Sequence, residues 1–282
     1  AAEPGVYADT SGYTTSAWNT DGSLAVDIIS TMVGWPIQFG FSNTGTNYHP
    51  TAMLYDNVVV AVADTPAPTP APTPAPTPAP ATADDLFISE TSEVGSTWTK
   101  YLEVANFTGA DVSLDGYFLG RVSNAPSVVG EYEVAIEFTS GATLANGDVW
   151  VLGRAEGTDG PDALRTNIDQ INTNISHNGD DSYFLYKKAA AEDAPSQTAT
   201  VVDVFGDQQG DPGSDWTACG DTAASSESVM IKKATKAGTD SWTTSAGTDA
   251  TDCWWEITKI SDQDAHDYAT VGSHTFTGET NN

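Results

Sequence analysis

The chain has 282 residues, enough for one or two domains, and its 39 acidic and 10 basic residues give a formal net charge of −29. This charge excludes a surface for DNA, RNA or anionic lipid, because no basic stripe is present to release counterions. No run of about 18 apolar residues occurs, so the sequence predicts no membrane insertion. The acidity fits either an extracellular protein kept soluble in salt or one that binds divalent cations.

The first piece, residues 1–63, alternates apolar and polar residues with the period of antiparallel strands. It resembles the C-terminal half of a carbohydrate-binding jelly roll, through a WNT-like strand at Trp18, an apolar strand at Trp35–Phe41 and the sequence YDNV at Tyr55–Val58. This resemblance implies a polysaccharide ligand. Trp18, Trp35 and Tyr48 are the candidates for stacking on sugar rings, although Trp35 also fits a core position.

The strands with which such jelly rolls begin have no counterpart in this piece. Half a sandwich leaves strand edges and an apolar face without partners. Either the sequence is a fragment, or strands of a neighbouring subunit complete the sheets by β-augmentation. In the second case we expect head-to-tail self-association into a filament, since the two contacting surfaces differ.

Residues 64–83 repeat Thr-Pro-Ala-Pro. Proline fixes φ and lacks an amide donor, so this linker is predicted to form a polyproline II rod that rises about 3.1 Å per residue and spans roughly 60 Å. The threonines that punctuate it are candidate O-glycan acceptors: Thr65, Thr69, Thr73 and Thr77.

The second piece, residues 84–260, shows period-two alternation broken by Gly, Asn, Asp and Pro, and it predicts a β-sandwich. The nine expected strands are Leu86–Glu90, Lys100–Asn106, Tyr117–Arg121, Glu131–Phe138, Asp148–Gly153, Ser182–Tyr186, Thr200–Phe205, Val229–Lys233 and Trp254–Thr258.

Other local signals add detail to the second piece. Leu164, Ile168, Ile171 and Ile175 are spaced as on a helix, after a Pro-Asp start signal, so we expect one short helix or helical turn there. NGDD at 178–181 is typical of a hairpin turn with positive φ. Residues 261–282 are expected to form a tail or a further strand.

Six segments of the second piece resemble, in order, the bacterial lamin-tail domain, an immunoglobulin-like sandwich. They are LFISE (86–90), YLEVANFTGADVSLDGYFL (101–119), LANGDVWVLGRA (144–155), HNGDDSYFLYK (177–187), VVDVFGDQQGDPGSDW (201–216) and SWTTSAGTD (241–249). The resemblance implies an attachment or interaction module without catalytic residues. The expected fold class is therefore all-β: a partial jelly-roll-like sandwich, a polyproline II linker and an immunoglobulin-like sandwich.

Cys219 and Cys253 are the two cysteines of the chain, 34 positions apart. In an exported protein we expect them to form one disulfide, with free thiols or a metal site as the alternatives. The chain begins at Ala1 with no signal peptide, as a processed, exported protein would, so an extracellular or cell-surface location is expected.

Several carboxylates are candidates for site chemistry. Asp207, Asp211 and Asp215 recur every four residues in a Gly-rich loop, and Asp180 and Asp181 occupy a turn. Calcium takes oxygen ligands from such loops, although the lamin-tail resemblance already explains the segment as a structural loop. Glu90 and Glu103 lie on adjacent predicted strands and could face each other, for hydrogen bonding or for acid–base work.

Two functions follow from these patterns. The first is a non-enzymatic extracellular structural or adhesive protein, a repeating subunit of a bacterial surface filament. The second is a carbohydrate-binding or attachment region of a larger secreted hydrolase or nuclease. No nucleophile motif such as G-x-S-x-G is present, so catalysis is not expected.

Overall fold

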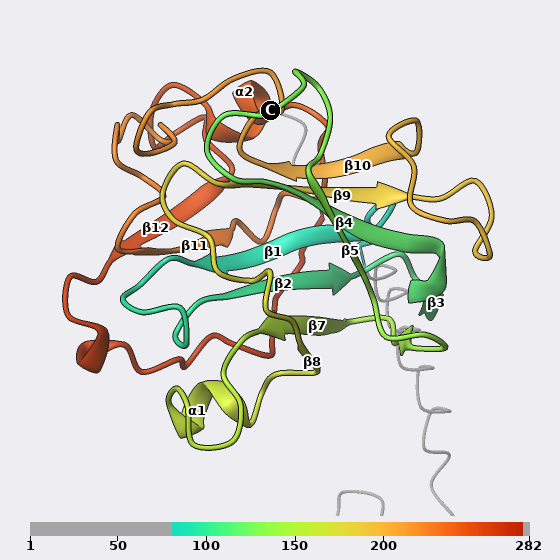
Figure 1. Cartoon of the computed structure of the whole chain (residues 1–282), viewed down its shortest axis with the longest axis horizontal. Helices are drawn as coiled ribbons and strands as arrows, with labels where there is room; N and C mark the ends of the chain where they lie inside the picture. Colours follow the sequence, from blue (N-terminus) through green and yellow to red (C-terminus); the bar gives the residue numbers. More distant parts are fainter. Residues whose placement is uncertain (1–80, 279–282) are drawn as a thin grey trace, which may run out of the picture. The chain divides into compact units, whose positions relative to one another are not determined.

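The computed structural model describes residues 81–278, which fold as a β-sandwich (Figure 1). The expected jelly-roll-like piece at 1–63 and the rod up to residue 80 lie outside these residues. No helix among residues 81–278 is long and apolar enough to cross a membrane.

One sheet has six strands in the order β12-β11-β1-β2-β7-β8. Neighbours are antiparallel except β7 and β8, which are parallel. The strands are β1 (Phe87–Ser92), β2 (Tyr101–Asn106), β7 (Asp148–Gly153), β8 (Gln170–Ile171), β11 (Ser228–Lys232) and β12 (Trp255–Lys259).

The second sheet has four antiparallel strands in the order β10-β9-β4-β5. They are β4 (Tyr117–Val122), β5 (Val134–Glu137), β9 (Ser182–Lys187) and β10 (Thr200–Phe205). A small ladder joins β3 (Val112–Ser113) to β6 (Thr143–Leu144). The helical turns are η4 (Leu114–Gly116), α1 (Asp162–Arg165), α2 (Trp242–Ala246) and η5 (Gln263–Ala265).

At its central strands β1 and β2, the six-stranded sheet is buried on both faces, and the strand period explains how. On β2, Leu102 and Val104 point into the main core between the sheets, whereas Tyr101 and Ala105 point to the outer face. Every residue of β1 and β2 is consequently buried. The main core also holds Trp216, Trp242 and Trp255.

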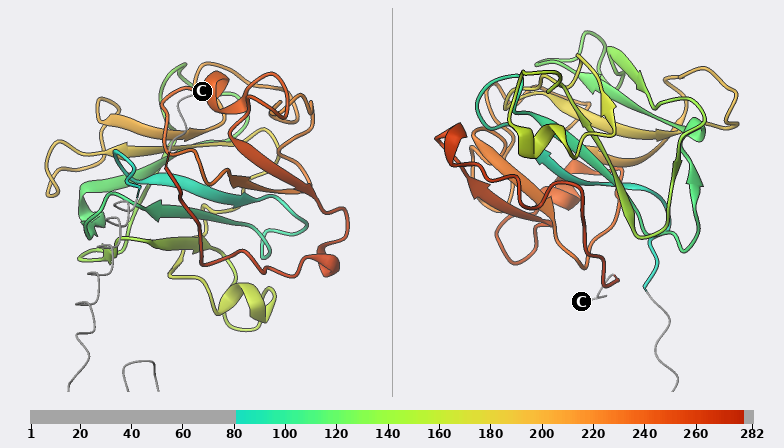
Figure 2. Two further views of the ribbon diagram at one scale, coloured as in Figure 1. Left: turned by 180° about the vertical axis from the view of Figure 1, so that it is seen from behind. Right: turned by 90° about the horizontal axis from the view of Figure 1, so that it is seen from below.

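The outer face is covered by the segment 260–278, here called the strap, which follows β12 and crosses the sheet (Figure 2, left). Tyr268, Val271 and Phe276 of the strap form a second apolar cluster with Phe87 of β1. The backbone N–H of Thr277 donates to the carbonyl of Ala234, which fixes the far end of the strap. The tail expected after residue 260 is therefore part of the domain and contains no strand up to residue 278.

The structure confirms one local prediction and contradicts another. The short helix or helical turn expected near Leu164 is present as the single turn α1, and it ends there because the chain then joins the sheet as β8. The NGDD sequence at 178–181 makes no hairpin, because β8 and β9 belong to different sheets and the turn carries the chain from one to the other. Gly179 has no positive φ, but a Cβ there would lie 2.4 Å from Oδ1 of Asp215.

Candidate functional site

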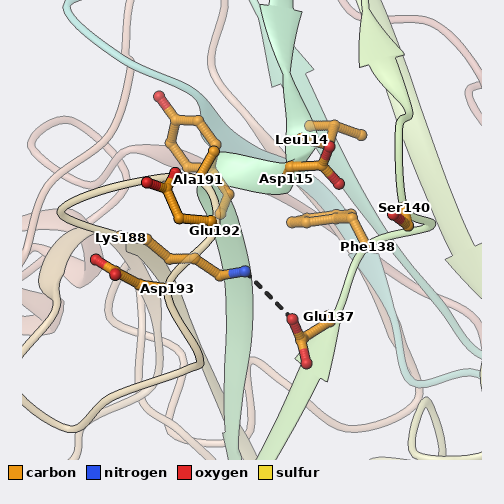
Figure 3. Close-up of a pocket in the computed structure, with 10 residues that line it drawn as sticks. Leu114, Asp115, Glu137, Phe138, Ser140, Lys188, Ala191, Glu192 and Asp193 are labelled. Atoms are coloured by element: carbon orange, nitrogen blue, oxygen red, sulfur yellow. Dashed lines mark hydrogen bonds and ion pairs between the residues drawn. The ribbon is translucent and has the colours of Figure 1, made fainter.

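A hollow of about 400 Å³ lies where β4 begins, β5 ends and the chain leaves β9 (Figure 3). Its lining comes from three segments that are far apart in the sequence: residues 114–117, 137–140 and 188–193. The lining residues are Leu114, Asp115, Tyr117, Glu137, Phe138, Ser140, Lys188, Ala191, Glu192 and Asp193.

The wall of the hollow is held by the main core. Leu114, Tyr117 and Phe138 are all buried members of that core, so their side chains are fixed by packing. The Tyr117 hydroxyl donates to Oδ1 of Asp85 at 2.5 Å, and the ammonium of Lys187 lies 5.5 Å from the ring centroid. Burial, with the hydrogen bond to Asp85, raises the pKa of Tyr117 to about 12, so this phenol stays protonated at neutral pH.

The rim of the hollow is acidic. It carries four carboxylates, from Asp115, Glu137, Glu192 and Asp193, and one ammonium, from Lys188. The Lys188 side chain is only 5% exposed, and its Nζ donates to Oε2 of Glu137 at 3.2 Å (Figure 3). This charge balance disfavours phosphate or carboxylate ligands and suits hydroxyl-rich or amine-bearing ones.

The polar groups of the hollow are four carboxylates, one ammonium and two hydroxyls, and they can bind a polar ligand. Its lining contains neither His nor Cys, and Ser140 supplies its one hydroxyl that is not a phenol. A serine nucleophile needs an adjacent base that is itself oriented by a third group. The lining shows no such arrangement.

The aspartates proposed from the sequence to bind calcium come partly together. Burial and the nearby charges of Asp181, Asp211 and Asp215 raise the pKa of Asp180. Asp181 is already paired, with its Oδ2 2.6 Å from a guanidinium nitrogen of Arg121. Among residues 81–278, no group of three or more His, Cys, Asp or Glu side chains is arranged to hold a metal ion. Calcium at Asp180, Asp181, Asp207, Asp211 and Asp215 stays a prediction that this finding does not support.

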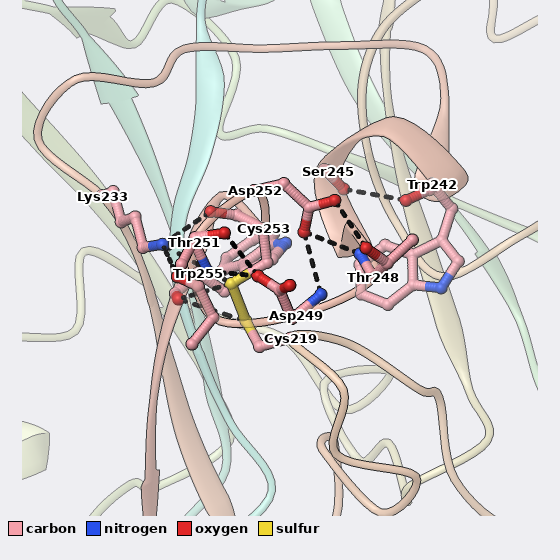
Figure 4. Close-up of a disulfide and its surroundings, with 11 residues drawn as sticks. Cys219, Lys233, Trp242, Ser245, Thr248, Asp249, Thr251, Asp252, Cys253 and Trp255 are labelled. Carbon is pink, nitrogen blue, oxygen red and sulfur yellow. Dashed lines mark hydrogen bonds between the residues drawn. A yellow bond between two sulfur atoms is a disulfide. The ribbon is translucent and has the colours of Figure 1, made fainter.

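The two cysteines are joined by a disulfide, as the sequence predicts (Figure 4). Their Cα atoms are 5.0 Å apart, and the bond ties the loop after β10 to the segment that enters β12. Next to it, Lys233 Nζ donates to the carbonyl of Cys253 at 2.7 Å, and Asp252 accepts from the backbone N–H of Thr248 and of Asp249. The surroundings are those of a structural crosslink.

His177 is a buried residue, and no sequence pattern predicted its role. Its Nε2 lies 2.8 Å from the carbonyl of Ser92, and its Nδ1 lies 3.1 Å from the hydroxyl of Tyr183. Burial, helped by the charges of Lys100 and Arg121, lowers the pKa of His177 to about 3. The imidazole is therefore neutral at physiological pH and serves as an internal hydrogen-bonding group.

Trp18, Trp35 and Tyr48, proposed to stack on sugars, lie outside the described residues, as do Thr65, Thr69, Thr73 and Thr77. Glu90 and Glu103 do face each other, as cross-strand partners on β1 and β2. Both are buried beneath the strap and away from the hollow of Figure 3.

Comparison with known proteins gives a family for part of the chain. Residues 79–208 match the family model described as Lamin Tail Domain, which confirms the resemblance read from the sequence. The match ends before β11 and β12, although both strands belong to the same six-stranded sheet.

Among solved structures, the chain is similar to the crystal structure of a DUF4876 family protein from Bacteroides thetaiotaomicron. That similarity has a TM-score of 0.36 and 10% sequence identity, and it covers 69% of this chain and 72% of that one. No curated protein matches the chain.

Proposed function

We propose that this chain, which carries a lamin tail domain at residues 79–208, is a non-enzymatic extracellular protein with a structural or adhesive role. The observation that carries the proposal is the disulfide between Cys219 and Cys253, because such bonds persist in oxidising compartments outside the cytosol. The lining of the hollow, with four carboxylates and one ammonium, offers groups that can bind a polar ligand.

In its finer form, the proposal makes the chain a repeating subunit of a bacterial surface filament. Residues 1–63 would accept strands from a neighbouring subunit head-to-tail, and the Thr-Pro-Ala-Pro linker would space the subunits. Support comes from the alternating apolar faces of the first piece, such as Val58, Val60 and Val62. Within the described domain, both faces of the six-stranded sheet are already buried at β1 and β2, so these two strands offer no open face to a neighbouring subunit.

Electron microscopy of the purified chain tests the filament. We expect fibres from the full chain, and a soluble monomer with an intact sandwich after deletion of residues 1–63. Fibres from the truncated chain would place the joint elsewhere. Only separate particles from the full chain, at every concentration, would contradict assembly.

The alternative is a carbohydrate-binding or attachment region of a larger secreted hydrolase or nuclease. The acidic hollow with its fixed rings favours it, because aromatic faces and carboxylates together suit a hydroxyl-rich ligand. Polysaccharide sedimentation with three variants tests this function. Loss of binding in Trp35→Ala and Tyr48→Ala would assign the first piece, and loss in Asp115→Asn would assign the hollow. Binding that survives all three would contradict both sites.

A further inference from the structure

The strap joins the rest of the domain through two buried carboxyl groups. Glu90 and Glu103 are cross-strand partners on the outer face of the six-stranded sheet and are 1% and 0% exposed. The register of β1 against β2 shifts between Ile88 and Glu90, so Ser89 is an extra residue beside them. Its hydroxyl donates to Oε1 of Glu103 at 2.6 Å.

The strap supplies a hydrogen bond to each carboxyl group. The hydroxyl of Thr270 donates to Oε1 of Glu90 at 2.8 Å, and the backbone N–H of Gly272 donates to Oε2 of Glu103 at 2.9 Å. The hydroxyl of Tyr101 also donates to Glu90. These contacts flank Val271, a residue with which the strap enters the second apolar cluster.

No salt bridge within residues 81–278 includes Glu90 or Glu103. Burial, together with the neighbouring charges of Glu90 and Asp169, raises the pKa of Glu103 to about 8 against the opposing effect of its hydrogen bonds. Burial also raises the pKa of Glu90. Two carboxylates side by side in this dry site would repel each other, so the docked strap favours protonated groups.

The other titratable groups near the pair have pKa values shifted in two directions, lowered for the histidines and raised for the acidic group. Burial lowers the pKa of His266 and lowers that of His274 to about 4. Asp169 shares the raised pKa of the two glutamates, again through burial. Tyr101 on β2 donates to Glu90, and the charge of Asp169, before β8, acts on Glu103. On the strap, His266 and Tyr268 pack against Tyr101, and His274 packs against Phe87. The charges that act on these strap groups come from Asp267 and Asp264 on the strap and from Lys232 on β11, which is paired with Asp203 on β10.

We propose that the strap, residues 260–278, is a pH-sensitive latch that stays closed over the outer sheet face while the Glu90–Glu103 pair holds a proton and opens when both carboxyls ionise. Opening uncovers the apolar side chains of Phe87, Tyr101 and Val151, which the strap now shields. The inference does not depend on the proposed function, because it rests on the contacts between the strap and the sheet alone.

The pH range of opening follows from the signs of these shifts. Because the pKa of Glu103 is raised in the closed state, its protonation stabilises the closed strap. This stabilisation is complete below pH 4.5 and is lost as the pH rises through about 8. The lowered pKa of His274 has the opposite effect. The neutral imidazole stabilises the closed strap above pH 6.5, and this stabilisation is lost as the pH falls through about 4. The two effects oppose each other between 4.5 and 6.5, so net opening is expected above about pH 6.5.

Hydrogen–deuterium exchange of the full chain tests the latch. Protection factors of strap peptides, corrected for the intrinsic exchange rate, should fall on the order of tenfold between about pH 6.5 and about pH 8.5, while those of β9 stay constant. In Glu103→Gln the fall should shrink to less than about twofold, because the neutral amide does not ionise. Glu256→Gln, at an exposed position on β12, is the matched control and should keep the fall.

Constant protection in the unaltered chain, or an undiminished fall in Glu103→Gln, would overturn the latch. If Glu103→Gln does not fold, the carbon-13 shift of the Glu103 carboxyl in the unaltered chain decides. A titration midpoint above about pH 6.5 supports the latch, and a midpoint near the ordinary value of 4.5 overturns it.

Discussion

Lys232 and Asp203 form a fully buried ion pair, and their Nζ and Oδ2 atoms are 2.5 Å apart. The same carboxylate accepts from the backbone N–H of Ile88 and of Thr239. The ammonium also lies 5.0 Å from the ring centroid of Trp255. One aspartate thereby links β10, β11, β1 and the loop before α2. A buried pair of this kind adds little net stability, but removing one of its two partners is strongly destabilising.

Asp203→Ala should reduce the free energy of unfolding by about 3–5 kcal/mol, because it leaves the Lys232 ammonium buried without its carboxylate. Urea unfolding followed by tryptophan fluorescence measures the change. The exposed Asp240, in the loop before α2, provides the matched control, and Asp240→Ala should change stability by less than about 0.5 kcal/mol. The double replacement Asp203→Leu with Lys232→Met should recover only part of the loss, because the backbone N–H groups of Ile88 and Thr239 still lack their acceptor. Equal losses in Asp203→Ala and Asp240→Ala would show that the pair is not needed.

At the scale of elements, the disulfide closes a loop that contains β11 and α2, with a sequence separation of 34. Cross-linking mainly restricts the unfolded chain, and the loop-entropy relation gives about 3–4 kcal/mol for a loop of this length. The bond therefore matters most for the part of the sheet that lies beyond the family match, β11 and β12.

Replacing both cysteines, Cys219→Ala with Cys253→Ala, should lower the free energy of unfolding by about 3–4 kcal/mol while the folded spectrum stays native. Chemical denaturation of the two proteins measures the difference. Adding a reductant to the unaltered chain should produce a similar loss and should leave the double variant unchanged. A reductant effect on the double variant would point to some other cause.

The strap is the element whose removal should cost most. A chain that ends at Ile260 loses Tyr268, Val271 and Phe276 and exposes the apolar outer face of the six-stranded sheet. Burial of three such side chains is worth about 1.5–3 kcal/mol each, so we expect partial unfolding or aggregation. Light scattering and binding of a hydrophobic dye measure this outcome. A stable, monomeric truncated chain would mean that the domain ends near residue 260.

The sequence predicted the long strands well because period-two alternation persists over four or more residues. All nine expected strands are present, with bounds shifted by three residues or fewer. The two-residue strands β3, β6 and β8 are too short to show a period, and the strap docks as irregular chain with unevenly spaced apolar residues. The hollow of Figure 3 had no local signature, because three distant segments assemble it. That Glu90 and Glu103 face each other could be predicted from their adjacent strands, whereas their burial under the strap could not.

For the whole molecule, charge and burial act together on the dependence of stability on pH. The formal net charge is −29 at pH 7 and the isoelectric point is about 4.1, so self-repulsion grows as the pH rises. The raised pKa of Glu103 works in the same direction up to about pH 8. The lowered pKa values of His177, about 3, and His274, about 4, act on the acid side, where unfolding lets the imidazoles take up protons.

We therefore expect the free energy of unfolding to be greatest between about pH 4.5 and about pH 6.5, more acidic than for most proteins. Stability conferred by the neutral His177 is present above 6.5 and is lost as the pH falls through about 3; that conferred by protonated Glu103 is present below 4.5 and is lost as the pH rises through about 8. Urea midpoints measured from about pH 3 to about pH 8 follow both the loss of stability at low pH, the acid limb, and the loss at high pH, the alkaline limb. Glu103→Gln should flatten the alkaline limb and His177→Gln the acid limb, each without altering the other.

Added salt should stabilise the chain more at about pH 8 than at about pH 5, since it screens the net charge but not the buried groups. A stability that stays level from about pH 6 to about pH 9, in low salt, would contradict both the charge argument and the buried carboxyl pair.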